Sequence, residues 1–184
     1  ATEVTYGCEK KVWWICPKGH SYKATINNRT LRQSGCPQCS NQSSEPEIRI
    51  LTELKYLFDD VVSRYKVDGI EIDVFLPEFK LGIEYDGKHW HKDKEEQDLE
   101  KNKLLVAQNI HLIRVREIPL RALSEEDVIV DKDCPLKKTD LNKILKKVSV
   151  LVNADINQRI DSYITQSSFV NDELFKEYRS YFPS

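Results

Sequence analysis

Three acidic side chains in two neighbouring stretches of the chain are candidates for metal-assisted chemistry. Asp73 lies in IEIDVFL, whereas Glu84 and Asp86 lie in LGIEYD. Polar and apolar residues alternate in both stretches, which predicts two strands that carry their carboxylates on one face. Carboxylates crowded on one face repel each other, and we expect a proton or a bound cation to relieve that repulsion. A solvated acidic face is the simpler alternative.

The short connection between these stretches predicts how the two strands align. Residues 77–80 form a four-residue loop, which is typical of an antiparallel hairpin. Pairing Leu76 with Leu81 then places two acidic pairs opposite each other, namely Asp73 with Glu84 and Glu71 with Asp86. Directly opposed like charges are destabilising, and carboxylate oxygens are the ligands that Mg²⁺ and Mn²⁺ prefer. The hairpin is therefore predicted to bind a divalent cation.

A further carboxylate is expected at the start of the preceding helix. Ser44 is the predicted N-cap, and Pro46 follows in the first turn. Glu47 comes one turn before Leu51 and so leads the apolar stripe of this helix. An acid on the face that packs inward indicates a site residue, and a favourable interaction with the helix dipole is the alternative.

Two pairs of soft ligands near the N-terminus have the spacing of a structural zinc site. Three residues separate Cys16 from His20. Two residues separate Cys36 from Cys39, and fifteen lie between the pairs. Four ligands in two tight turns suit tetrahedral zinc, and a segment this short needs a metal because it cannot build a core of its own. Buried thiols are the alternative.

The N-terminal segment also interleaves basic and aromatic residues, as nucleic-acid-binding fingers do. Its candidate contacts to nucleic acid are Lys18, Lys23, Arg29 and Arg32. Docking to another protein is the alternative. The formal net charge of −2 hides basic ends around an acidic middle. That distribution suits a protein that grips a polyanion and holds cations at its centre, although solvated surface charge also explains each patch.

The composition excludes several classes of protein. Hydrophobic residues make up 40% and charged residues 32%, which suits a soluble globular protein and not a disordered one. No apolar run approaches the roughly 20 residues of a membrane span. Five cysteines do not form an even disulfide framework. We therefore expect a cytoplasmic protein that does not enter a membrane.

Two parts of the chain resemble known families. The stretch KKVWWICPKGHSYKATINNRTLRQSGCPQC resembles the small treble-clef-like zinc ribbons that bacterial and phage proteins carry as repeats, which implies zinc ligation by both ligand pairs. Asp73, followed on the next strand by Glu84, resembles the motif of the restriction-endonuclease-like PD-(D/E)xK superfamily. Glu47 matches the helix Glu of that superfamily. This second resemblance covers roughly residues 45–120.

The superfamily lysine is missing, because Asp86 stands two residues after Glu84. Lys88 is a substitute if the chain turns at Gly87. The stretch IEYDGKHWH resembles the very-short-patch repair endonuclease branch and related phage homing endonucleases. That resemblance implies that Asp86 and His91 are site residues, with His91 as a general acid or base, a task that histidine side chains commonly perform.

The segments after the hairpin complete the expected core. A helix is predicted in KDKEEQDLEKNKLLVAQNI, followed by the strand HLIRVREIPL. Arg114 and Arg116 share one face of that strand, where they contact phosphate or pair with the acidic helix. An amphipathic helix is predicted from Thr139 to about Gln166, with a break near Asn153, and a shorter aromatic-rich helix follows.

The sequence as a whole predicts an α/β protein with three parts. These are a zinc ribbon over residues 1–43, a restriction-endonuclease-like core with a mixed central sheet flanked by helices over 44–120, and a helical extension over 121–184. The resemblance implies an endonuclease that hydrolyses phosphodiester bonds of double-stranded DNA, with Mg²⁺ or Mn²⁺ as catalytic cation and structural Zn²⁺. The alternative is an inactive nucleic-acid- or protein-binding module. The extension packs on the core, forms a homodimer or lies along DNA.

Overall fold

The computed structural model describes residues 5, 7–16, 19–31, 36, 43–92, 94–131 and 135–181. The chain divides into two compact units, which comprise residues 1–44 with 172–184 and residues 45–171. No helix among the described residues is long and apolar enough to cross a membrane.

The first unit contains a two-stranded antiparallel sheet and a short helix. Its elements are β1 (Lys11–Ile15), β2 (Ser21–Thr25) and α1 (Ile26–Thr30), and the last described helix of the chain is α8 (Asp172–Tyr181). Trp13 on β1 lies opposite Lys23 on β2. The helix α1 begins directly after β2 because the Thr25 hydroxyl accepts the backbone N–H of Asn28 at 3.1 Å and so caps the first turn.

The second unit is built on a five-stranded mixed sheet in the order β3-β4-β5-β6-β7. These strands are β3 (Val62–Val67), β4 (Ile70–Leu76), β5 (Leu81–Asp86), β6 (His111–Glu117) and β7 (Val128–Val130). The strand β4 is antiparallel to both of its neighbours, whereas β5, β6 and β7 are mutually parallel. A parallel step needs a crossover connection, which the helix α5 (Glu95–Ala107) provides between β5 and β6. The predicted α/β class with a mixed sheet is therefore confirmed.

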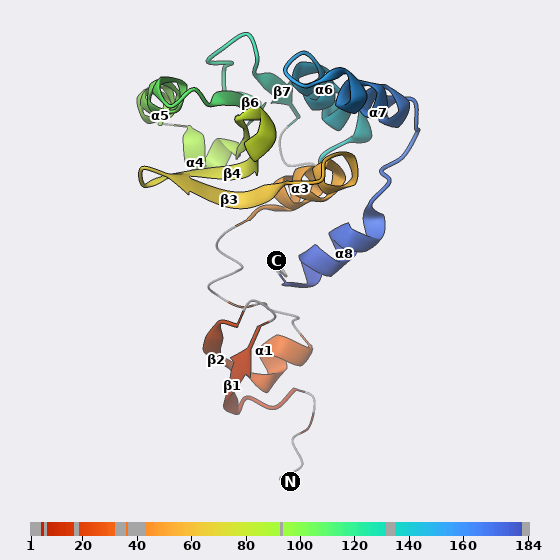
Figure 1. Cartoon of the computed structure of the whole chain (residues 1–184). Helices are drawn as coiled ribbons and strands as arrows, with labels where there is room; N and C mark the ends of the chain where they lie inside the picture. The colour runs from red at the N-terminus through yellow and green to blue at the C-terminus, as the bar shows by residue number, and fades with distance from the viewer. Residues whose placement is uncertain are drawn as a thin grey trace. The chain divides into compact units, whose positions relative to one another are not determined.

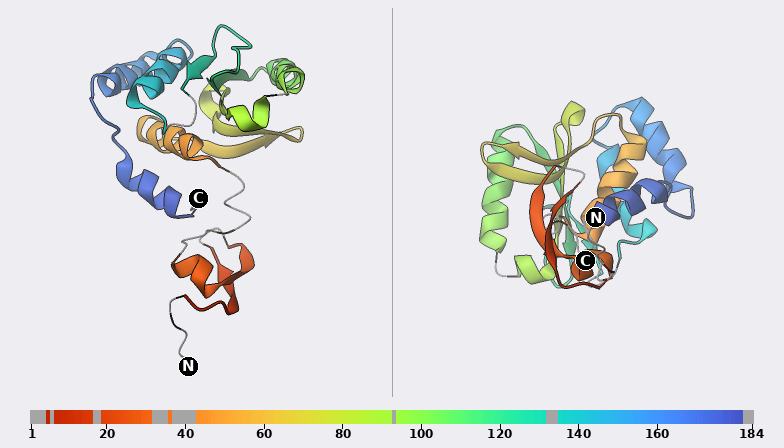
Figure 2. Two further views of the ribbon diagram at one scale, coloured as in Figure 1. Left: turned by 180° about the vertical axis from the view of Figure 1, so that it is seen from behind. Right: turned by 90° about the horizontal axis from the view of Figure 1, so that it is seen from below.

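Helices cover both faces of this sheet (Figure 1). They are α3 (Glu45–Leu57), α4 (Lys88–His91), α5 (Glu95–Ala107), α6 (Lys138–Ser149) and α7 (Ala154–Ile164), and the 3₁₀ turn η1 (Pro77–Phe79) joins β4 to β5. In the right-hand view of Figure 2, α5 lies on one side of the sheet and α3, α6 and α7 lie on the other. The predicted break near Asn153 is confirmed, because its side chain accepts the N–H of Ile156 at 3.0 Å and starts α7.

The β4–β5 hairpin has the predicted register at its closed end. Leu76 pairs with Leu81, and the pairing continues for two further positions. Beyond them β4 diverges from β5 and pairs with β3 alone. Glu71 therefore lies opposite Lys66 of β3, with 3.6 Å between the ammonium and a carboxylate oxygen. The predicted pair of Glu71 with Asp86 is wrong.

The divergence begins at Asp73. Arg64, which would stand opposite Asp73 on β3, has a φ of 55° and is skipped by the ladder. Because the strand bends here, its alternation of faces is interrupted. Strict alternation would place Ile72 and Phe75 on opposite faces, but both belong to one buried cluster with Leu105 of α5. Asp73 lies just beyond the last ladder pair with β5, and its side chain, not its backbone, bonds to that strand.

Candidate active site

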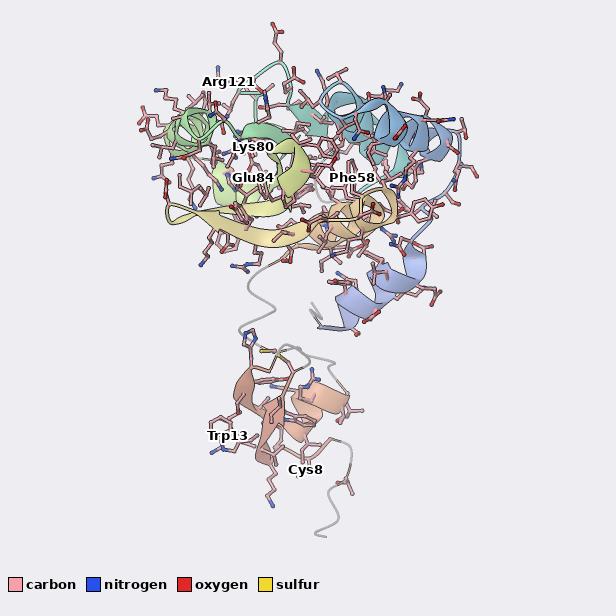
Figure 3. The ribbon with its side chains drawn as sticks, viewed as in Figure 1. Cys8, Trp13, Phe58, Lys80, Glu84 and Arg121 are labelled. Carbon is pink, nitrogen blue, oxygen red and sulfur yellow. The ribbon has the colours of Figure 1, made fainter. Side chains whose placement is uncertain are left out.

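A side-chain hydrogen bond connects Asp73 of β4 to β5, beyond the point where the backbone pairing of these two strands ends. Its Oδ2 accepts the backbone N–H of Tyr85 at 3.0 Å. This bond brings the carboxylate next to Glu84, the residue that precedes Tyr85 (Figure 3 labels Glu84). Of the two acidic pairs predicted across the hairpin, the structure therefore brings together Asp73 and Glu84.

Both carboxylates have raised pKa values. Burial, and after it the negative charge of Asp73, raises the pKa of Glu84 to about 7. Glu84 is 4% exposed. Burial also raises the pKa of Asp73, although the N–H of Tyr85 and the charge of Lys101 lower it. Two neighbouring carboxylates that resist ionisation favour either a proton or a bound cation between them.

Lys101 of α5 supplies the positive charge that both carboxylates share. Its Nζ forms an ion pair with Oε1 of Glu84. Its charge lowers the pKa of Glu84 and also that of Asp73. Among the residues that the structure describes, no lysine or arginine forms an ion pair with Asp73 itself. Lys101 thus forms a direct ion pair with Glu84, whereas it acts on Asp73 through its charge alone.

Asp86 is neutralised by two arginines from β6. Arg114 Nη1 lies 2.8 Å from both carboxylate oxygens of Asp86, and Arg116 Nη1 lies 3.2 Å from Oδ2. The parallel pairing of β5 with β6 places Glu84 opposite Arg114 and Asp86 opposite Arg116. The expectation that only a proton or a bound cation relieves the crowding is therefore wrong for Asp86. This residue anchors an internal ion-pair cluster.

His91 is held in one orientation by Asp98 of α5. The His91 Nδ1 atom lies 3.0 Å from each carboxylate oxygen of Asp98 and 3.6 Å from Oδ1 of Asp86. Arg116 Nη2 in turn lies 3.2 Å from Oδ2 of Asp98. A ring nitrogen between carboxylates carries the hydrogen and donates a hydrogen bond to them. The other ring nitrogen, Nε2, is therefore the one left for proton transfer.

The spacing of Asp86, His91 and Asp98 would also allow a metal, since their ligand atoms lie within 4.8 Å of one another. The same carboxylates already contact Arg114 and Arg116 at 2.8 to 3.6 Å. A divalent cation at this position would face two buried guanidinium groups at close range. We therefore interpret the cluster as the support that orients His91.

Tyr85 is the residue of β5 whose surroundings include the charge of Glu47 and, through Glu117, the backbone of Lys88. Tyr85 donates its hydroxyl to Glu117 Oε1 at 2.8 Å, and it alternates with Glu84 along the strand. Burial and the hydrogen bond to Glu117 raise the pKa of Tyr85, and the charge of Glu47 adds to this effect. The backbone N–H of Lys88 donates to Oε2 of Glu117 at 3.0 Å. Glu117 thus accepts hydrogen bonds from Tyr85 and from the Lys88 backbone, and Glu47 acts on Tyr85 through its charge.

The first unit brings the soft ligands together. Cys16, His20 and Cys36 have ligand atoms within 4.8 Å of one another, and Cys36 Sγ lies 3.8 Å from His20 Nδ1. Sulfur and nitrogen ligands of one tetrahedral zinc are separated by about 3.6 Å, so the three side chains fit this metal. The backbone N–H of Cys16 donates to His20 O at 3.0 Å and tightens the first turn. The predicted fourth ligand, Cys39, lies outside the described residues.

The basic residues predicted to contact nucleic acid have different positions. Lys18 and Arg32 lie outside the described residues. Lys23 is exposed on β2. Arg29 packs inward, with its guanidinium carbon 5.4 Å from the centre of the Trp14 ring. Of the four, Lys23 is thus described as accessible to a partner.

Sequence reasoning missed Lys101 and Asp98 as site residues. The two stand three positions apart on α5, so they share one side of the helix. In a helix rich in Glu and Lys this spacing has the appearance of solvated surface. The signal that could have found them lies in the following strand. Arg114 and Arg116 were predicted to share one face of that strand, and pairing with the acidic helix was one of their two predicted roles. That pairing is confirmed, with Asp98 as the partner.

Comparison with known proteins identifies the N-terminal part of the chain. Residues 1–42 match the family described as a probable treble clef zinc finger domain. Neither the curated proteins nor the solved structures contained a match. The matched segment contains Cys16, His20 and Cys36, the three described side chains that could hold a metal, which makes zinc a plausible ligand there.

Proposed function

We propose that this protein is a Mg²⁺- or Mn²⁺-dependent DNA endonuclease whose zinc unit assists DNA binding. The observation that carries the proposal is the Asp73–Glu84 pair. Two carboxylates from adjacent strands are held together in a mostly buried position, and the pKa of each is raised. Perturbed carboxylates of this kind are characteristic of functional sites. The mixed sheet with helices on both faces agrees with the architecture that the PD-(D/E)xK resemblance implies.

Each residue near the pair has a role in this proposal. Asp73 and Glu84 would hold the divalent cation, which supplies a more acidic water and neutralises charge on the phosphate. Lys101 takes the place of the motif lysine that Asp86 displaces, because its ammonium reaches Glu84 from α5. His91, oriented by Asp98, exchanges a proton through Nε2. Asp86 acts indirectly by fixing Arg114, Arg116 and the histidine.

A nicking assay on supercoiled plasmid tests the proposal. The parent protein is expected to cleave with added Mg²⁺ or Mn²⁺ and to be inactive without it; omitting the cation is preferable to chelation, which would also remove zinc. Asp73→Asn is expected to abolish cleavage, and His91→Ala to slow it by about 10²- to 10⁴-fold. Asp59→Asn changes an exposed acid and serves as the control. Equal cleavage by Asp73→Asn and the parent would refute the enzyme assignment.

A nucleic-acid-binding module without activity is the second candidate. The observation in its favour is that Glu84 and Asp86 are already compensated by Lys101, Arg114 and Arg116. This candidate requires DNA binding by the parent with no cation-dependent cleavage. The two candidates are separated by measuring binding and nicking on the same preparations.

A further inference from the structure

The hairpin of β1 and β2 in the first unit has an outer face that exposes large apolar side chains. Trp13 is 69% exposed and Ile15 is 76% exposed on β1. The alternate residues of the hairpin, Trp14 and Tyr22, point to the other face, where the ring of Trp14 packs against Arg29 of α1. Figure 3, which labels Trp13, shows its ring directed away from α1. The hairpin therefore has an inner face that packs and an outer face that does not.

Two lysines share the outer face with Trp13. Lys23 is the direct cross-strand neighbour of Trp13, so their Cβ atoms lie about 5 Å apart. Lys11 lies two positions before Trp13 on the same side of β1, about 7 Å away along the strand. The nearest described acid in the sequence, Glu9, accepts a hydrogen bond from Asn27 of α1 at 2.5 Å. The outer face thus combines one aromatic surface with positive charge.

We propose that this outer face, formed by Lys11, Trp13, Ile15 and Lys23, binds single-stranded DNA. An exposed aromatic ring beside lysines matches a base that stacks and phosphates that flank it. Duplex DNA fits less well, because its bases are already stacked and must be unstacked before a side chain can insert. A stable protein partner normally needs about 20 to 30 residues on each side. This face offers only a few side chains, so charge and size both favour a nucleic-acid strand.

The inference extends the proposed function, from which it takes DNA as the partner, but it does not depend on cleavage. Arg29 and Lys23 were predicted together as nucleic-acid contacts, but the inference gives them different roles. Lys23 belongs to the binding face, whereas Arg29 supports the hairpin from behind. A strand held here would be one that has left its duplex, as occurs next to a cleaved or melted site.

Fluorescence anisotropy with a labelled oligothymidine tests the proposal in the full-length, zinc-loaded Asp73→Asn protein without Mg²⁺. Trp13→Ala is expected to weaken binding about 5- to 150-fold, and Trp13→Tyr to retain most of it because an aromatic ring remains. Lys11→Ala and Lys23→Ala are each expected to reduce the slope of log K against log salt by about 0.7. Leu31→Ala, which alters a 63% exposed apolar side chain at the end of α1, is the matched control and should bind normally.

The bound zinc of every variant is measured, and if Trp13→Ala loses zinc, Trp13→Tyr and the lysine salt slopes decide the outcome. Unchanged affinity and salt slope in these variants would overturn the proposal and leave the face to a protein partner. If the variants lost affinity only for duplex DNA, added as a competitor, the assignment to a single strand would be overturned. Because the binding protein carries Asp73→Asn, these results are independent of whether the parent cleaves DNA.

Discussion

Glu84 is the residue at which the opposing charges of the site meet. Its carboxylate contacts Lys101 and lies 3.4 Å from Arg114 Nη1, yet burial and Asp73 hold its pKa at about 7. An acid whose pKa is raised in the folded state retains its proton there more readily than in the unfolded chain. Ionising Glu84 beside Asp73 therefore lowers the stability of the folded state, and such perturbed acids are common at functional sites.

The metal-free protein is predicted to lose stability as pH rises. Between about pH 4.5 and pH 7 the folded state binds the Glu84 proton and the unfolded state does not, so the free energy of unfolding falls. The shift from 4.5 to about 7 corresponds to about 3 kcal/mol. Urea unfolding of the parent and of Glu84→Gln at pH 5 and pH 8 measures this effect. The variant should gain about that amount relative to the parent at the higher pH.

Excess Mg²⁺ provides the complementary measurement. A cation bound by Asp73 and Glu84 stabilises the folded state by mass action, so it should raise the unfolding midpoint of the parent at pH 8. The same addition should leave Asp73→Asn unchanged. A pH dependence that is identical in the parent and in Glu84→Gln would show that another group is responsible.

At the level of elements, a buried carboxylate joins α3 to the segment around α7. Glu53 of α3 is fully buried. Its oxygens accept hydrogen bonds from the hydroxyl of Tyr163 at 2.6 Å and from the backbone N–H groups of Val170 and Asn171 at 3.0 and 3.1 Å. Arg49 balances the charge at 3.1 Å. One side chain thus satisfies donors that are more than 100 positions away in sequence.

Replacing Glu53 with Ala is expected to destabilise this unit by about 3–5 kcal/mol, because the Tyr163 hydroxyl and the N–H groups of Val170 and Asn171 would lose their buried charged acceptor. Tyr163→Phe removes one hydrogen-bond donor and should cost about 1–3 kcal/mol. Urea unfolding measures both changes. Asp161→Ala, an exposed acid on α7, is the control and should stay within about 0.5 kcal/mol of the parent. A similarly small effect of Glu53→Ala would contradict the structural role.

At the scale of the whole molecule, the two units depend on different forces. The unit of residues 45–171 has a sheet covered on both faces, with Leu54, Ile113 and Val148 fully buried. The N-terminal segment offers a five-residue strand pair and a five-residue helix around its metal ligands. Segments this small rely on a metal for stability, since they bury too little apolar surface.

Zinc removal is therefore predicted to unfold the N-terminal segment and to leave the second unit intact. Limited proteolysis with mass spectrometry should show cleavage within residues 1–44 after chelation, while the fragment of residues 45–171 persists. Cys16→Ser should have the same effect and reduce the bound zinc. Cys8→Ser is the matched control, because Cys8 is not among the clustered ligands. Unfolding of both units together on chelation would refute the prediction that zinc stabilises the N-terminal segment alone.

The sequence by itself determined the local features of this protein. Alternation and loop length predicted the pairing of Leu76 with Leu81, and the spacing of Cys16, His20 and Cys36 predicted a common metal site. The break near Asn153 was also predictable, because capping depends on a side chain and the N–H three residues later. Each of these features depends on residues that are close in sequence or on one short connection.

Only the tertiary structure decided which cations face which carboxylates. The parallel pairing of β5 with β6 joins strands separated by α5, and it places Arg114 and Arg116 against Asp86. The bend at Asp73 and the reach of Lys101 to Glu84 likewise arise from packing between distant segments. Local patterns fix where a side chain lies on its own element. The energy of a buried charge depends on its neighbours in space, and those are set only when the elements pack together.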